Sequence, residues 1–269
     1  MDIDIDNIDI AQIVKEIPSI MAVEEAQFLH DIVYRVPSHG AIVEIGSYLG
    51  GSTIILAHAA RAGHKGMVYA IDPHRGALLW NLPFGRRLSL EPFLDNIRQA
   101  GLSDFVTPLV GSSSKIHRTW NKPISLLWID GSHWYRAVKQ DLLNWEPFVV
   151  EGGFIIMHDA VFLKIRRDSV THTSNIPARF FGVEQAAHEM LKTGRFEVIA
   201  TVTCLLCVVK KQSGTASEFR RERFLRPFKS IIFFPLEVSL CYYRDVLKVV
   251  HQVLGWFGQV ARSLGLLRR

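Results

Sequence analysis

Two apolar segments of the chain, ISLLWID and GGFIIMHD, each end in residues that can do chemistry. The first ends in Asp130 with His133 three residues later, and the second ends in His158 and Asp159. If both segments are neighbouring strands of a parallel sheet, these side chains meet at the edge where such sheets bind ligands. We expect Asp130, His158 and Asp159 to bind Mg²⁺ or another divalent cation, since carboxylates and imidazole are ligands of such ions. Asp130 and His133 are the predicted catalytic residues, with His133 as general base.

The ligand types leave the identity of the metal, and the need for one, open. A metal lowers the pKa of bound water from about 15.7 to about 7, and a bound hydroxyl should be acidified in the same sense. Imidazole at position 158 suits softer ions than Mg²⁺. The alternative for His158 is a strand-end histidine satisfied by ordinary hydrogen bonds. Asp141 lies within the next predicted helix, where we expect it to pair with neighbours of Lys139 rather than reach the site.

A glycine-rich turn, VEIGSYLGGST, spans residues 43–53. Gly46 and Gly50 allow the backbone to approach a ligand closely, and the following helix start offers N–H groups that have no partner within the helix. The spacing differs from the dinucleotide pattern G-x-G-x-x-G, and Glu44 would repel a pyrophosphate but suit a ligand that carries a cation. Asp72 ends the next predicted strand, where an acid commonly binds ribose hydroxyls. The alternative is a tight strand–helix connection without a ligand.

With this turn, IDPH (71–74), WIDGSHWYRAVKQDLLNW (128–145) and GGFIIMHDA (152–160), the segment 38–210 resembles the class I S-adenosylmethionine-dependent methyltransferases. It is most similar to the branch with antibiotic and sugar O-methyltransferases and cephalosporin-hydroxylase-like proteins. The resemblance implies S-adenosyl-L-methionine as cofactor and a hydroxyl of a sugar or sugar-containing metabolite as acceptor. Metal-dependent relatives carry acids after the same two strands. The implied cofactor contacts are Glu44, Gly46, Ser47 and Gly50 for the methionine part, Asp72 for the ribose, Gly111, Ser112 and Ser113 for the adenine, and Asp130 beside them.

Strand-like and helix-like segments alternate through the same region, which predicts an α/β fold. With the resemblance, we expect a Rossmann-like, mostly parallel sheet with helices on both faces and an antiparallel hairpin strand at its C-terminal edge. Residues 8–36 carry helical periodicity before the turn at 37–40. The predicted strands are 41–46, 66–72, 105–111, 124–130, 152–159, 196–201 and 203–210, and the predicted helices are 52–63, 91–100, 135–149 and 183–194.

Charge divides the chain into a slightly acidic body and a basic tail. Residues 1–209 hold 19 Lys+Arg and 22 Asp+Glu, net −3, whereas residues 210–269 hold 12 and 4, net +8. We expect an N-terminal helical segment (1–37), a cofactor-binding domain (38–210), a polar linker (211–217) and an amphipathic helical tail (218–269). Such a tail suits peripheral contact with an anionic membrane surface, or packing on the domain or on a second subunit of a homo-oligomer. Nucleic acid is not an expected partner, because the apolar stripe exceeds what phosphate contact requires.

Three cysteines are too few for a disulfide framework, and the start MDIDIDNIDI lacks the features of a secretory signal. The expected location is therefore cytoplasmic, extending to the inner face of the membrane if the tail binds there. Cys204 and Cys207 are interpreted as buried strand residues whose side chains point to opposite faces. The alternatives to a methyltransferase are an NAD-dependent oxidoreductase, disfavoured by Glu44, and a non-catalytic membrane-associated binding module.

Overall fold

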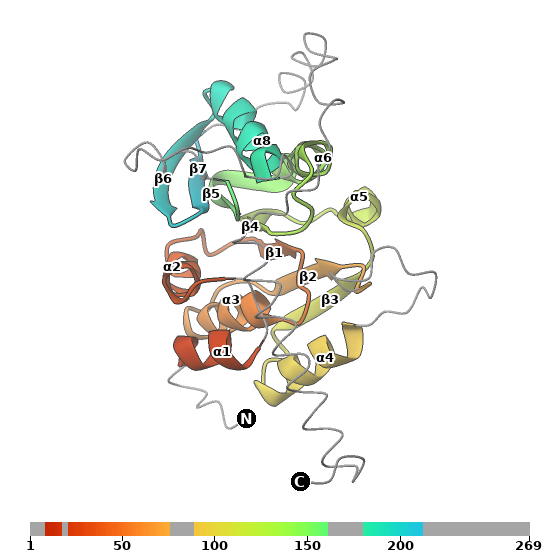
Figure 1. Ribbon diagram of the computed structural model, residues 1–269. Coiled ribbons are helices and arrows are strands. Elements are labelled where there is room, and N and C mark those ends of the chain that lie inside the picture. Colours follow the sequence, from red (N-terminus) through yellow and green to blue (C-terminus); the bar gives the residue numbers. More distant parts are fainter. Residues whose placement is uncertain (1–8, 18–20, 76–88, 161–179, 212–269) are drawn as a thin grey trace, which may run out of the picture. The chain divides into compact units, whose positions relative to one another are not determined.

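The computed structural model describes residues 9–17, 21–75, 89–160 and 180–211 (Figure 1). Within these residues, seven strands form one sheet in the order β3-β2-β1-β4-β5-β7-β6. Neighbours from β3 to β5 are parallel, while β7 is antiparallel to both β5 and β6. The predicted α/β fold with a C-terminal antiparallel hairpin is confirmed. The strands are β1 Ala41–Ile45, β2 Val68–Asp72, β3 Val106–Val110, β4 Ile124–Ile129, β5 Val149–Met157, β6 Phe196–Val202 and β7 Leu205–Lys210.

Helices cover both faces of this sheet. One apolar core joins α1, α2, α3 and α4 to one face, and a second joins α6 and α8 to the other. The central strands β1 and β4 are buried along their whole length, which explains why their sequences are nearly continuous apolar runs. The helices are α1 Ile10–Glu16, α2 Val23–Val33, α3 Gly51–Ala62, α4 Leu90–Gln99, α5 Ser113–Ile116, α6 Tyr135–Trp145 and α8 Phe180–Lys192, with 3₁₀ turns η1 His117–Thr119 and η2 Glu146–Phe148.

The N-terminal helical periodicity corresponds to two helices, not one. α1 ends where Ile17 takes an extended backbone conformation, and the next residue is a proline, which disfavours the helical conformation before it. α2 begins after Ala22, whose backbone N–H donates to the Glu25 carboxylate at 2.9 Å. Glu25 thus stabilises the start of α2 from its third helical position.

The predicted helix 135–149 is too long by four residues. α6 ends at Trp145 and continues as the 3₁₀ turn η2, in which the second residue is Pro147. Proline lacks the N–H that would continue the α-helical bonding. The chain then enters β5 at Val149, earlier than predicted.

Cys204 is not a strand residue, contrary to the prediction. β6 and β7 pair directly up to Val202 and Leu205, so Thr203 and Cys204 form a two-residue hairpin turn. Thr203 adopts a positive φ of 48°, as such turns require. Cys207 is buried in β7 as predicted. The turn carries the Cys204 thiol beyond the strand, to the edge of the sheet where β5 ends.

The predicted linker and tail begin where the described residues end, so residues 212–269 lie outside them. In the part of the chain that the structure describes, no helix is both long and apolar enough to span a membrane.

Candidate active site

The turn after β1 presses directly against the backbone that follows β4. Gly46 has a φ of +98°, and a Cβ built on it would lie 2.3 Å from the carbonyl oxygen of Asp130. No residue with a side chain fits there without moving the backbone. Gly50 has a φ of +91° and immediately precedes α3. The glycine turn predicted to hold a cofactor is therefore in contact with the predicted catalytic acid.

Asp72 ties two turns together at the end of β2. Its carboxylate accepts the backbone N–H of Tyr48 at 2.9 Å and that of His74 at 2.5 Å. Tyr48 itself has a positive φ of 44°, so this bond helps to hold a conformation that tyrosine rarely adopts. The Asp72 carbonyl also accepts the N–H of Gly111 at 3.0 Å. Asp72 is thus beside both the glycine turn and the turn after β3.

Glu44 is fully buried beneath the glycine turn. Its carboxylate accepts hydroxyl hydrogen bonds from Ser52, at 2.5 Å, and from Thr53, both in the first turn of α3. Burial raises the pKa of Glu44 to about 7, against the opposing effect of these hydroxyls and that of Ser47. The Ser47 side chain is also buried, and its carbonyl accepts the N–H of Gly50 at 2.8 Å. Through its hydrogen bonds to Ser52 and Thr53, Glu44 therefore connects the end of β1 to the first turn of α3 beneath the glycine turn.

The turn after β3, which was predicted to contact adenine, leads into the short helix α5. Ser112 precedes that helix, and its hydroxyl lies 3.2 Å from that of Ser114. The hydroxyl of Ser113 donates to the buried Asp141 at 2.5 Å. Burial raises the pKa of Asp141 to about 6. Asp141 therefore pairs with Ser113, while Lys139 bonds to Tyr135 and Glu189, so the predicted pairing of Asp141 near Lys139 is wrong.

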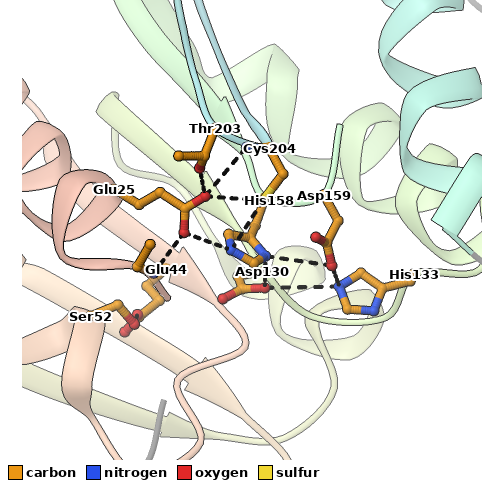
Figure 2. A network of polar contacts seen from close by, with 10 residues as sticks. Glu25, Glu44, Ser52, Asp130, His133, His158, Asp159, Thr203 and Cys204 are labelled. Carbon is orange, nitrogen blue, oxygen red and sulfur yellow. Dashed lines mark hydrogen bonds and ion pairs between the residues drawn. The ribbon is translucent and has the colours of Figure 1, made fainter. Parts of the chain in front are cut away.

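Asp130, His133, His158 and Asp159 meet at the ends of β4 and β5, as the sequence predicts (Figure 2). His158 Nδ1 lies 3.4 Å from Asp130 Oδ1 and 3.5 Å from Asp159 Oδ2. His133 Nε2 lies 3.1 Å from Asp159 Oδ2 and 3.9 Å from Asp130 Oδ1. Asp159 has a positive φ of 57°. Aspartate tolerates this conformation better than most residues, and here it turns the carboxylate toward both histidines.

Burial and the neighbouring charges shift the pKa values of Asp130, His158 and Asp159. Burial raises the pKa of Asp130 to about 7, while the charge of His158 opposes this rise. Because 26% of the Asp130 side chain remains exposed, water screens part of the effect. Burial alone would lower the pKa of His158, yet the surrounding acids, Asp130 first, raise it well above 6.5. Burial would raise the pKa of Asp159, but its bonds to His158 lower it. The acids around His158 therefore favour the protonated form of its imidazole.

Three residues that the sequence analysis did not single out for the site complete it. Glu25 from α2 and Cys204 contact the other side of the His158 ring, and Thr203 bonds to Glu25 (Figure 2). Glu25 Oε2 lies 3.4 Å from His158 Nε2. The thiol of Cys204 donates to Glu25 Oε1 at 3.0 Å, and the hydroxyl of Thr203 donates to the same oxygen. A glutamate at the third position of a helix signals a cap, but nothing local signals a contact with His158.

The donor atoms at this edge have the spacing of a metal site. Ligand atoms of Asp130, His133 and His158 lie within 4.8 Å of one another, and so do those of Glu25, His158 and Cys204. Asp159 adds a further oxygen to the first set, 3.5 Å from His158 Nδ1. The first set with Asp159 contains the predicted ligands. The residues present therefore fit a divalent cation, provided that His158 Nδ1 is deprotonated when it binds.

Comparison with known proteins identifies the central part of the chain. Residues 43–160, which contain the glycine turn and both acid–histidine segments, match the model of a family described as a methyltransferase domain. The fold is similar to that of the O-methyltransferase NovP, at 19% identity over 72% of this chain and 83% of NovP, with a TM-score of 0.55.

Two further similar structures contain the cofactor or its product. The O-methyltransferase TomG from Streptomyces achromogenes, solved with S-adenosylmethionine, is 21% identical over 71% of this chain and 82% of its own, with a TM-score of 0.52. An O-methyltransferase from Bacillus cereus, solved with S-adenosylhomocysteine, is 18% identical over 75% of this chain and 90% of its own, with a TM-score of 0.54. At these identities the similarity establishes the fold. The family match identifies residues 43–160 as a methyltransferase domain, and the similar structures show the fold to which this domain belongs.

Proposed function

We propose that the protein is an O-methyltransferase that methylates a hydroxyl of a sugar or sugar-containing small molecule. The observation that carries the proposal is the contact between the glycine turn and the backbone of Asp130, whose side chain belongs to the acid–histidine cluster. Gly46 leaves no room for a Cβ against the backbone of Asp130, and His133 lies 3.9 Å from the Asp130 carboxylate and 3.1 Å from that of Asp159, so a cofactor bound on that turn would be close to these side chains. The structures similar in fold include O-methyltransferases. The sugar acceptor rests on the sequence resemblance.

Different residues would bind the three parts of the cofactor. Asp72, whose orientation is fixed by two backbone N–H groups, would accept the ribose hydroxyls. The turn of Gly111, Ser112 and Ser113 would contact the adenine. Glu44, Gly46, Ser47, Gly50 and Asp130 would surround the methionine part, where carboxylates favour the positive charge of a sulfonium.

Methyl transfer to a hydroxyl requires two functions of the enzyme. S-adenosylmethionine supplies a methyl group that is already activated for displacement, so the protein must align the acceptor and remove its proton. The imidazole of His133 would accept that proton. Asp159 Oδ2, 3.1 Å from His133 Nε2, would then stabilise the imidazolium that forms. This assigns the general base to His133 and the orienting carboxylate to Asp159.

We include a divalent cation in the proposal, held by Asp130, His158 and Asp159. When bound, it would lower the pKa of the acceptor hydroxyl. The imidazole ligand favours Mn²⁺, Fe²⁺ or a similar ion over Mg²⁺. Removing metals with EDTA and restoring Mg²⁺, Mn²⁺ and Fe²⁺ separately tests this part. We expect turnover to fall with EDTA and return with one ion; unchanged turnover throughout would remove the metal from the mechanism.

The acceptor can be found directly. The protein is incubated with methyl-labelled S-adenosylmethionine and extract of the host, and the labelled product is isolated and its methyl position determined. We expect an O-methyl group on a sugar-containing small molecule. A label on nitrogen or carbon would overturn O-transfer, and a labelled product without sugar would overturn the acceptor class alone. Titration with S-adenosylhomocysteine and NAD tests the oxidoreductase alternative, which requires NAD to bind.

For residues 218–269 we propose peripheral contact with an anionic membrane surface. The support is their composition: residues 218–269 hold 10 Lys+Arg and 4 Asp+Glu, net +6, with aromatic and aliphatic residues at helical spacing. Such contact would bring the enzyme close to lipid-linked acceptors. Packing on a second subunit is the competing role.

A further inference from the structure

The His158 ring lies between two groups of partners, one at each nitrogen (Figure 2). Nδ1 faces the acids Asp130 and Asp159, at 3.4 and 3.5 Å. Nε2 faces Glu25 at 3.4 Å and the thiol of Cys204 at 3.6 Å. His158 is only 4% exposed, so these contacts define the orientation of its ring. The Glu25 side of the ring comes from residues outside the 43–160 segment that matches the methyltransferase family.

Glu25 is itself held firmly. One carboxylate oxygen accepts the backbone N–H of Ala22 at 2.9 Å, in addition to its contact with His158. The other accepts the hydroxyl of Thr203, the backbone N–H of Cys204 at 3.3 Å and its thiol at 3.0 Å. Glu25 is 2% exposed. A buried carboxylate with this many donors is a fixed acceptor, able to hold a ring N–H in one direction.

Glu25, His158 and Cys204 also have the ligand types of a soft metal site. However, both Glu25 oxygens already accept backbone N–H groups, and these bonds hold the start of α2 and the hairpin turn. A metal on Glu25 would compete with those bonds. The contacts therefore favour a hydrogen-bonded support for His158 over a second metal site.

We propose that Glu25 is a positioning residue, which holds the His158 ring with Nε2–H toward α2 and Nδ1 toward Asp130. This inference rests on the proposed function, because the role of Glu25 would be to present His158 Nδ1 to Asp130 and the proposed metal site. A metal ligand histidine commonly donates its other ring N–H to such a carboxylate, which fixes the ring and its tautomer. Loss of such a partner typically costs 10- to 100-fold in metal affinity or activity.

The test uses imidazole ¹⁵N NMR of the full chain, with His158→Asn to assign the His158 signals. In the wild type we expect a hydrogen-bonded Nε2–H proton on His158, and in Glu25→Gln we expect this proton to exchange faster and its signal to shift. Glu24→Gln is the matched control, since Glu24 precedes Glu25 on α2 but is exposed. It should leave the His158 signals unchanged. Glu25→Asp, which keeps the charge, should retain part of the wild-type signal.

The outcomes separate positioning from a structural role. If Glu25 only ties α2 to the hairpin, Glu25→Gln lowers the melting temperature while the His158 signals stay as in the wild type, and the proposal is overturned. If Glu25→Gln does not fold, the wild-type spectrum still decides, because a His158 ring without a protonated Nε2 contradicts the proposal. Stoichiometric Zn²⁺ in the purified protein that is lost in Cys204→Ser would favour the metal site instead. Absence of methyl transfer by the wild type would overturn the proposed function and leave the NMR result standing.

Discussion

At the scale of single residues, the site depends on two acids whose burial raises their pKa. Glu44 and Asp130 both have a pKa raised to about 7, and both are next to the glycine turn. A cation on that turn would favour their charged forms. Glu44, which is fully buried, destabilises the fold at neutral pH, because a buried acid is costly to ionise.

Glu44 allows this cost to be measured. Its pKa rises from 4.5 in the unfolded chain to about 7 in the fold, so between these values the folded state binds more protons and stability falls as pH rises. Glu44→Gln removes the charge and keeps groups that can bond to Ser52 and Thr53. The variant should lack this loss of stability. We therefore expect the difference in free energy of unfolding between Glu44→Gln and wild type to grow by about 2 to 3 kcal/mol from pH 5 to pH 8, in favour of the variant.

Urea unfolding of both proteins without cofactor, at the two pH values, gives the comparison. Glu91→Gln at the exposed start of α4 serves as control and should show no such change. A constant difference between Glu44→Gln and wild type across this range would mean that Glu44 ionises normally.

At the scale of elements, the sequence predicted every strand of the sheet because apolar runs between turns are local signals. The ends of β4 and β5 were predicted with their acids and histidines, since parallel neighbours place their carboxyl ends together. The break after Ile17 was missed because helical periodicity continues through it, although Pro18 marked the position. Glu25 was missed for a different reason. Its partners His158 and Cys204 are 133 and 179 residues away, so no local pattern connects them.

A buried ion group joins η2 to the C-terminal hairpin. Glu146 pairs with Arg195 at 2.9 Å, just before β6, and with Lys210 at 2.9 Å, at the end of β7. All three side chains are buried. Glu146→Gln would remove the charged carboxylate that pairs with both buried cations, and we expect it to reduce the free energy of unfolding by about 3 to 5 kcal/mol.

The exposed pair Lys211–Glu197, also 2.9 Å apart and 52% exposed on both sides, supplies the control. Glu197→Gln should cost less than about 1 kcal/mol. Equal losses for the two variants in urea unfolding would show that burial does not matter to the Glu146 group.

At the scale of the whole molecule, the net charge of +5 is the sum of two opposite parts. The body has a net charge of −3 and contains the acids around the glycine turn, while the last 60 residues have +8. If the tail binds anionic lipid, the full chain should float with vesicles that contain phosphatidylserine, and added salt should weaken this binding.

The matched comparison is a chain that ends at Lys211, the last residue that the structure describes, provided that it retains affinity for S-adenosylhomocysteine. We expect this shorter chain to stay with the soluble fraction. Equal flotation of both chains, or of neither, would exclude the tail as a membrane contact, and a change from dimer to monomer on truncation would assign it to subunit packing.

The central claim is that the His133 site, beside the glycine turn, performs methyl transfer to oxygen. The most direct measurement is the single-turnover rate of methyl transfer to the identified acceptor by wild type and His133→Gln, with S-adenosylhomocysteine affinity measured in parallel. We predict a rate about 10²- to 10⁴-fold lower for the variant, as expected for loss of a general base, with cofactor affinity within about twofold. A variant rate within about threefold of wild type would contradict the account.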